Sequence, residues 1–163
     1  MHYSITSKGN RFYEAFNESN NVVATLEYET WATRKAKISV AAGFTYQLAG
    51  VGFWQTRISV TKGDIAFAEI KPVLGRGFQL TFSGTAQSFM FKKKSTFSTD
   101  YKVIDDYDTE MATVDVNFKW KSLSYEYEVE VNNNTLDNEI NLMLPLLLVY
   151  CSRYMRMRQS AAT

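Results

Sequence analysis

The sequence predicts a mostly β protein: a closed antiparallel barrel of about twelve strands wrapped around a buried hydrophobic C-terminal α-helix. Apolar and polar residues alternate with period two through residues 3–131, the pattern of half-buried strands. Residues 142–151 then form one apolar run. This run is too short to cross a bilayer, which takes about 20 residues, and it is apolar on every face. The rest of the protein must therefore surround it.

Ten short strands are expected before a final hairpin. They lie near residues 3–6, 11–16, 22–29, 36–41, 45–48, 55–61, 64–71, 77–82, 88–92 and 101–104. The clearest breaks between them fall where Gly, Asn and Asp favour turns, at 8–10, 17–21, 62–64 and 74–77.

The final hairpin is the longest and has two different faces. Its apolar face is expected to carry Ala112, Val114, Val116, Phe118, Trp120, Leu123, Tyr125, Tyr127, Val129 and Val131. The other face places outward lysines opposite outward carboxylates, which favours cross-strand pairs. One face in water and one in the core is typical of antiparallel sheets.

A helix is predicted over about residues 138–157, with Asp137 or Asn138 as its N-cap. Pro145 is expected to kink it, because proline removes one backbone hydrogen bond. A helix that begins only at Asn141 is the alternative. The cluster Arg153, Arg156 and Arg158 follows the apolar run and is expected to mark where the helix leaves the barrel and meets water.

The whole chain, residues 1–163, is expected to form one domain, because no linker or low-complexity tract divides it. Twelve strands at about 4.8 Å spacing and about 40° tilt give a barrel wall about 12 Å in radius. Such a barrel has room for one helix with its side chains, which is about 10–12 Å across. The helix is therefore the expected core.

Charge and composition restrict the chemistry. Lys and Arg number 18 against 17 Asp and Glu, so the net charge of +1 gives no reason to expect nucleic acid. His2 is the only histidine and lies at the N-terminus, which leaves no Ser-His-Asp arrangement and no histidine-based metal site. Cys151 is the only cysteine and should be a small buried hydrophobe. No enzyme activity, cofactor or metal is therefore expected.

The N-terminal residues contain no apolar segment typical of a secretory signal. A cytoplasmic location is the expectation that follows. No segment is long enough to predict a transmembrane helix.

Lys92, Lys93 and Lys94 form the one concentrated basic segment, and Lys71 with Arg76 adds a smaller one. Three adjacent lysines at a strand end suit a phosphorylated head group, because each basic residue near an anionic surface contributes about 1 kcal/mol. The same residues also fit solubilising charges at a strand edge. Both interpretations stay open on the sequence.

The acidic turn at residues 105–110 offers oxygen atoms at alternating positions, from Asp106, Asp108 and Glu110. This spacing suits a weak calcium site, but Met111 stands where a calcium loop has glycine. A solvated turn is the favoured interpretation.

Residues 13–28 align without gaps on residues 101–116, each as a strand, an acidic or Asn-rich turn and a second strand. These two units, the Gly-Phe-Trp segment at 52–54 before a central strand, and the terminal apolar helix resemble the tubby C-terminal-like superfamily. That superfamily includes tubby proteins, phospholipid scramblases and the plant LURP-one-related proteins. The resemblance spans nearly the whole chain and implies a barrel of roughly twelve strands around a hydrophobic C-terminal helix.

The functional residues of that superfamily do not transfer to this chain. Tubby domains bind phosphoinositide head groups through basic residues on the barrel wall, and no position here matches that motif. The calcium-binding segment of scramblases is acidic, as residues 105–110 are, but these lie between strands and not beside the terminal helix.

Three functions fit the sequence. The leading hypothesis is a non-enzymatic binding or scaffold module whose partner is unknown. The first alternative is peripheral binding of anionic phospholipid head groups through the lysine cluster. The second is an intracellular lipid carrier, which requires an empty barrel. An anionic phospholipid or a protein is the expected kind of partner.

Overall fold

The computed structural model describes residues 1–132 and 136–161. Twelve antiparallel strands close into a barrel in which neighbours in sequence pair and β1 pairs with β12. The strands are β1 (His2–Lys8), β2 (Phe12–Phe16), β3 (Val22–Tyr28), β4 (Ala36–Val40), β5 (Thr45–Val51), β6 (Arg57–Lys62), β7 (Ile65–Val73), β8 (Gly77–Phe82), β9 (Ser88–Lys93), β10 (Tyr101–Ile104), β11 (Glu110–Lys119) and β12 (Ser124–Val131). The predicted fold class is confirmed.

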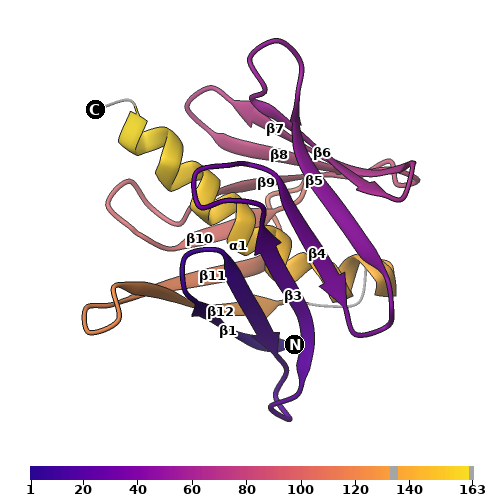
Figure 1. The fold of residues 1–163 in the computed structure, drawn as a ribbon. Coiled ribbons are helices and arrows are strands. Elements are labelled where there is room, and N and C mark those ends of the chain that lie inside the picture. Colours follow the sequence, from indigo (N-terminus) through magenta and orange to yellow (C-terminus); the bar gives the residue numbers. More distant parts are fainter. Residues whose placement is uncertain (133–135, 162–163) are drawn as a thin grey trace.

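The C-terminal helix, α1 (Asn138–Ala161), runs through the middle of the barrel with the strands arranged around it (Figure 1). All of its residues from Met143 to Ser152 are buried. Each of the twelve strands contributes buried apolar side chains to the same core. The apolar run is thus the filling of the barrel, as predicted, and Cys151 is one of its buried residues.

The final hairpin shows the predicted alternation of faces along most of its length, and Val114 lies opposite Val129. An ion pair of 3.2 Å joins Lys119 and Glu126 on its charged face. The prediction was wrong for Trp120 and Leu123, which lie in the turn and are exposed. The tip of this hairpin projects past the neighbouring strands (Figure 1), whereas Val116 and Tyr125 still pack against the core.

The helix begins at its predicted position. Asp137 is the N-cap: its Oδ1 accepts a hydrogen bond from the Glu139 N–H at 2.9 Å, and its carbonyl accepts the first intrahelical bond, from Asn141. The alternative start at Asn141 is therefore wrong. Pro145 lies inside the continuous helix and leaves the carbonyl of Asn141 without its usual donor. Packing on every side of the helix offsets that loss.

Both ends of α1 are tied to the wall. Near its start, Glu139 Oε1 accepts hydrogen bonds from Tyr46 and from Lys62, and these bonds lower the pKa of the Glu139 carboxyl. Near its end, the Tyr154 hydroxyl donates to the Thr56 carbonyl at 2.7 Å, and Arg153 donates to the Asn10 carbonyl at 2.8 Å. Among the described residues, no helix is both long and apolar enough to span a membrane.

Candidate functional site

The five predicted basic residues lie on one side of the barrel, on β7, the β7–β8 turn, β9 and the start of the β9–β10 loop. Lys71 and Lys92 point outward, because their strand neighbours Ile70 and Phe91 are buried. Arg76 lies in the turn. Gly77 brings that turn onto β9, since a Cβ on Gly77 would lie only 2.1 Å from the Phe91 carbonyl oxygen.

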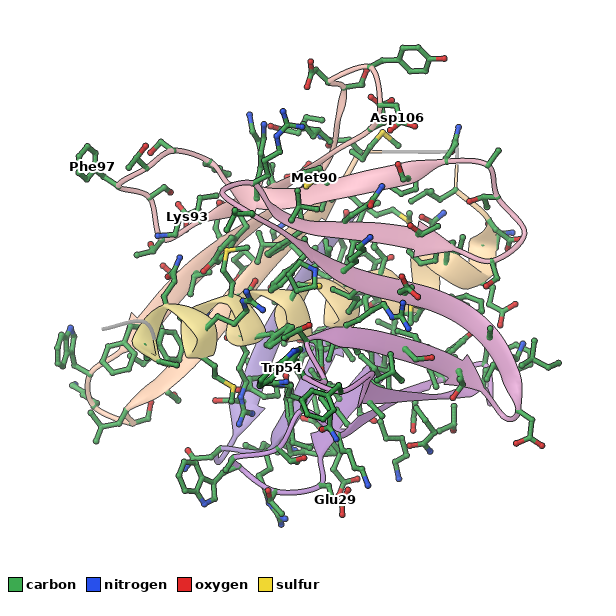
Figure 2. The ribbon with its side chains drawn as sticks, turned by 90° about the horizontal axis from the view of Figure 1, so that it is seen from above. Glu29, Trp54, Met90, Lys93, Phe97 and Asp106 are labelled. Carbon is green, nitrogen blue, oxygen red and sulfur yellow. The ribbon has the colours of Figure 1, made fainter. Side chains whose placement is uncertain are left out.

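The three adjacent lysines do not act as one unit. Lys94 pairs with Asp115, and this hydrogen bond raises the pKa of the lysine above its usual value. Lys93 lies opposite the buried Tyr101 and so follows the inward alternation of β9 at its end. Figure 2 shows Lys93 at the base of the β9–β10 hairpin. Of these three lysines, only Lys92 lies on the outer wall without an ion-pair partner among the described residues.

Lys92 gains a partner that the sequence did not indicate. Lys102 on β10 lies directly opposite it, and both point outward because their neighbours Phe91, Tyr101 and Val103 are buried. Like charges at directly opposed positions destabilise a sheet. We call Lys71, Arg76, Lys92 and Lys102 the basic patch.

Within the described ranges, no residue of the basic patch makes an ion pair. Two outward carboxylates near the patch are already paired, Glu69 with Arg57 at 3.5 Å and Asp115 with Lys94. The patch therefore concentrates positive charge without internal compensation. Such a surface attracts anions.

Topology places a second feature beside the patch. Because every strand is antiparallel to its neighbours in sequence, alternate hairpins lie at the same end of the barrel. The hairpins β1–β2, β3–β4, β5–β6, β7–β8, β9–β10 and β11–β12 share the end where α1 finishes.

Five of these six hairpins carry large exposed apolar side chains, each between 69% and 101% exposed. These residues are Trp31, Phe53, Trp54, Leu74, Phe97, Trp120 and Leu123, and we call them the aromatic rim. All three tryptophans of the protein belong to it. Phe97 projects well away from the body of the molecule (Figure 2). Phe53 and Trp54 lie in the loop before β6, which agrees with their predicted position ahead of a central strand.

The two ends of the barrel have opposite charge. The six loops at the rim end contain six basic residues, Arg11, Arg34, Lys35, Arg76, Lys94 and Lys121, against the acidic Glu29 and Asp100. The connections at the opposite end contain six acidic residues and no basic one: Glu18, Asp64, Asp105, Asp106, Asp108 and Asp137. A near-neutral chain is thus strongly polarised along its barrel axis.

The acidic turn belongs to that opposite end. Asp105 Oδ1 accepts hydrogen bonds from the N–H groups of Tyr107 and Thr109, and Asp106 accepts one from the Ser88 hydroxyl at 3.1 Å. These contacts order the turn itself. In the part of the chain that the structure describes, no three acidic, His or Cys side chains converge as metal ligands.

Comparison with known proteins extends the fold assignment. No family model and no curated protein matches the sequence. The X-ray structure of a protein from Arabidopsis thaliana matches with a TM-score of 0.57 and 11% sequence identity, covering 91% of this chain and 88% of that chain. At this identity the likeness shows the fold alone: this chain shares, along nearly all of its length, the architecture of the plant protein.

Proposed function

We propose that this protein is a non-enzymatic module that binds the surface of membranes rich in anionic phospholipid. The main support for this proposal is that the aromatic rim and the basic loops lie at the same end of the barrel. Soluble surfaces rarely expose so many large apolar groups together without a partner. Trp, Phe and Leu mixed with Arg and Lys are typical of segments that lie in the membrane interface.

The arrangement favours a membrane over a single protein partner. The rim side chains stand on separate hairpin tips, so they suit insertion into a deformable phase better than one shaped pocket. Three such side chains at about 2 kcal/mol each, and two basic residues at about 1 kcal/mol each, contribute about 8 kcal/mol before association entropy is subtracted.

The basic patch strengthens the same orientation. Arg76 lies in a rim hairpin, and Lys92 and Lys102 lie near the rim ends of β9 and β10. With the rim inserted, these side chains would face the head-group layer. Their uncompensated charge, including the directly opposed lysine pair, is then neutralised by lipid phosphates.

We further propose membership of the tubby C-terminal-like superfamily. Twelve strands closed around a hydrophobic C-terminal helix, together with a solved structure of like fold across most of the chain, support this assignment. The lipid-carrier alternative is not supported, because a carrier needs an empty interior and α1 fills the interior of this barrel. A scaffold that binds another protein through the rim is the competing outcome of the test below.

The test is co-sedimentation with vesicles, using phosphatidylcholine alone or with phosphatidylserine. Binding is expected only to the anionic vesicles and should weaken as salt rises. Native tryptophan emission should shift to the blue on binding, since all three tryptophans are in the rim. Lys71→Ala with Lys92→Ala should reduce binding at low salt by at least about fivefold.

The matched pair of variants decides which surface binds. Trp54→Ala with Phe97→Ala removes two rim side chains and should reduce partitioning by at least about tenfold. Ile65→Ala with Tyr107→Ala removes two equally exposed side chains from the opposite end and should leave partitioning unchanged. Equal losses in the two pairs, or no binding by the unmodified protein, would refute the proposal and leave the rim to a protein partner.

A further inference from the structure

Residues 94–100 form the β9–β10 loop at the rim end of the barrel. The tip of this loop is exposed from Lys94 to Phe97, and Phe97 projects well away from the body of the molecule (Figure 2). The hydroxyl group of Thr96 lies at this tip and makes no hydrogen bond to any residue that the structure describes. It is therefore available to a second protein that can reach the loop.

The residues around Thr96 form the pattern that basophilic protein kinases select. Lys93 and Lys94 stand three and two positions before the threonine, and Phe97 follows it directly. Both lysines are at least partly exposed. Kinases choose substrates by charge, and carboxylates in the cleft of a basophilic kinase pair with basic residues that precede the acceptor hydroxyl. An apolar side chain directly after the acceptor adds contact area beside the reacting group.

The loop can deliver Thr96 to a kinase cleft while the barrel stays folded. Inside the loop, the backbone hydrogen bonding of the described residues is limited to the Ser98 N–H, which donates to the Ser95 carbonyl at 3.1 Å. The ion pair of Lys94 with Asp115 lies at the surface, where such pairs contribute little to stability. Lys94 can therefore exchange this partner for a carboxylate of the kinase. A segment with so few internal bonds opens at a low cost in free energy.

A second hydroxyl group at the rim end has a similar sequence environment but a different structure. Ser122, in the β11–β12 turn, follows Lys119 and Lys121. Leu123 comes next and has a positive φ of 50°, as in a tight turn. The Ser122 Oγ shares a hydrogen bond of 2.6 Å with the Ser124 Oγ. This short turn has no spare length to extend through a cleft while β11 and β12 stay paired. The structure thus distinguishes two hydroxyl groups that the sequence does not.

We propose that Thr96 is a phosphorylation site for a basophilic serine/threonine kinase, and that the phosphate releases the aromatic rim from anionic membranes. In the transfer, the Thr96 Oγ1 forms a bond to the γ-phosphorus of ATP, and the bond from that phosphorus to the β–γ bridging oxygen breaks. ADP leaves with the bonding electron pair, and the hydroxyl proton passes to the catalytic aspartate of the kinase. The site itself needs no membrane, whereas the release rests on the membrane binding proposed above.

The new charge would enter the most positive part of the surface. A phosphothreonine carries a charge of about −1.5 to −2 at pH 7. The rim loops contain six basic residues against two acidic ones, so one phosphate offsets up to about half of the positive excess. The phosphate also lies next to Phe97, and a side chain beside a dianion enters an apolar layer only at a high desolvation cost. Attraction to lipid and insertion of the rim are therefore both weakened.

The first test is phosphorylation of the intact chain by two basophilic kinases, cyclic-AMP-dependent kinase and protein kinase C, with the site mapped by mass spectrometry. A single phosphate is expected at Thr96. Thr96→Val should abolish the modification, and Ser122→Ala should leave it complete. No phosphate with either kinase, or a phosphate at Ser95 or Ser122 in place of Thr96, overturns the site.

A matched pair of double variants tests whether the preceding lysines select the site. Lys93→Ala with Lys94→Ala should lower the rate of Thr96 phosphorylation at least about tenfold. Lys119→Ala with Lys121→Ala removes the same charge from the neighbouring hairpin and should leave the rate unchanged. Equal rates for the two double variants contradict recognition through the lysines.

Vesicle co-sedimentation separates the site from its consequence. The phosphorylated protein should partition at least about tenfold more weakly onto vesicles containing phosphatidylserine, and a phosphatase should restore binding. Kinase-treated Thr96→Val should partition as the unmodified protein does. Equal partitioning of the two forms overturns the release. Phosphorylation of Thr96 in a protein that fails to bind vesicles supports the site and refutes the membrane proposal, and the release with it.

Discussion

The contribution of α1 to stability can be tested at Leu147, in the middle of the helix. This side chain is 0% exposed and surrounded by the barrel wall. Leu147→Ala removes three carbon atoms and leaves a cavity. Leucine-to-alanine changes in protein cores cost about 2–5 kcal/mol, and the cost is highest where the surroundings cannot collapse.

The upper part of that range applies here. The wall is a ring of twelve strands closed by hydrogen bonds between β1 and β12, so it cannot shrink onto a narrower helix without breaking pairs. We expect a loss of about 3–5 kcal/mol in the free energy of unfolding. For a chain of this size that corresponds to a fall in Tm of about 6–20 °C.

The assay is urea denaturation followed by far-ultraviolet circular dichroism. Tryptophan fluorescence is a poor probe, because all three tryptophans are already exposed in the folded protein. The control is Leu123→Ala, which makes the same change at an exposed leucine and should cost at most about 0.5 kcal/mol. A loss below about 1 kcal/mol for Leu147→Ala would refute the view that α1 is the core of the barrel.

Three further predictions concern single positions. Glu139→Gln should lower the Tm at pH 7, and the difference should shrink as pH falls through the folded-state pKa of Glu139. Hydrogen bonds from Lys62 and Tyr46 hold that pKa below its usual value of 4.5, so the carboxylate stabilises the fold above 4.5 and this contribution is lost in acid. Cys151 should react with a thiol reagent only as fast as the protein unfolds, because burial raises the pKa of its thiol and blocks access. Gly77→Ala should destabilise the protein more than Gly43→Ala in thermal melts, because both glycines have positive φ but only at Gly77 would the new Cβ collide with the Phe91 carbonyl.

The fold could be predicted from the sequence because both of the patterns that determine it can be recognised within short segments of the chain. Alternation with period two identifies strands, and an apolar run without a polar face requires enclosure. The same alternation misplaced Trp120 and Leu123, since a strand pattern continues past the point where the barrel ends. The pattern of side chains along one strand contains no information about how far the core extends.

The candidate sites were harder to predict, because each is assembled by barrel closure. Lys102 lies opposite Lys92 only through the pairing of β9 with β10, and the hairpins of the aromatic rim come together only because the strands close into a ring. One feature of the sequence could have located the aromatic rim. Once twelve antiparallel strands are predicted, alternate loops must lie at the same end of the barrel. All three tryptophans fall in or beside such loops, and that alone locates the rim.

The closure of the barrel also determines the order in which this chain can fold. The pairing of His2 with Glu130 joins the first strand to the last, and α1 is synthesised after both. Each strand therefore leaves the ribosome with an apolar face and nothing to bury it against. Long sequence separation between contacting residues slows folding and prolongs the exposure of unpaired strand edges. We expect the nascent wall to depend on chaperones until the helix arrives, so that translation speed before residue 138 influences the yield of folded protein.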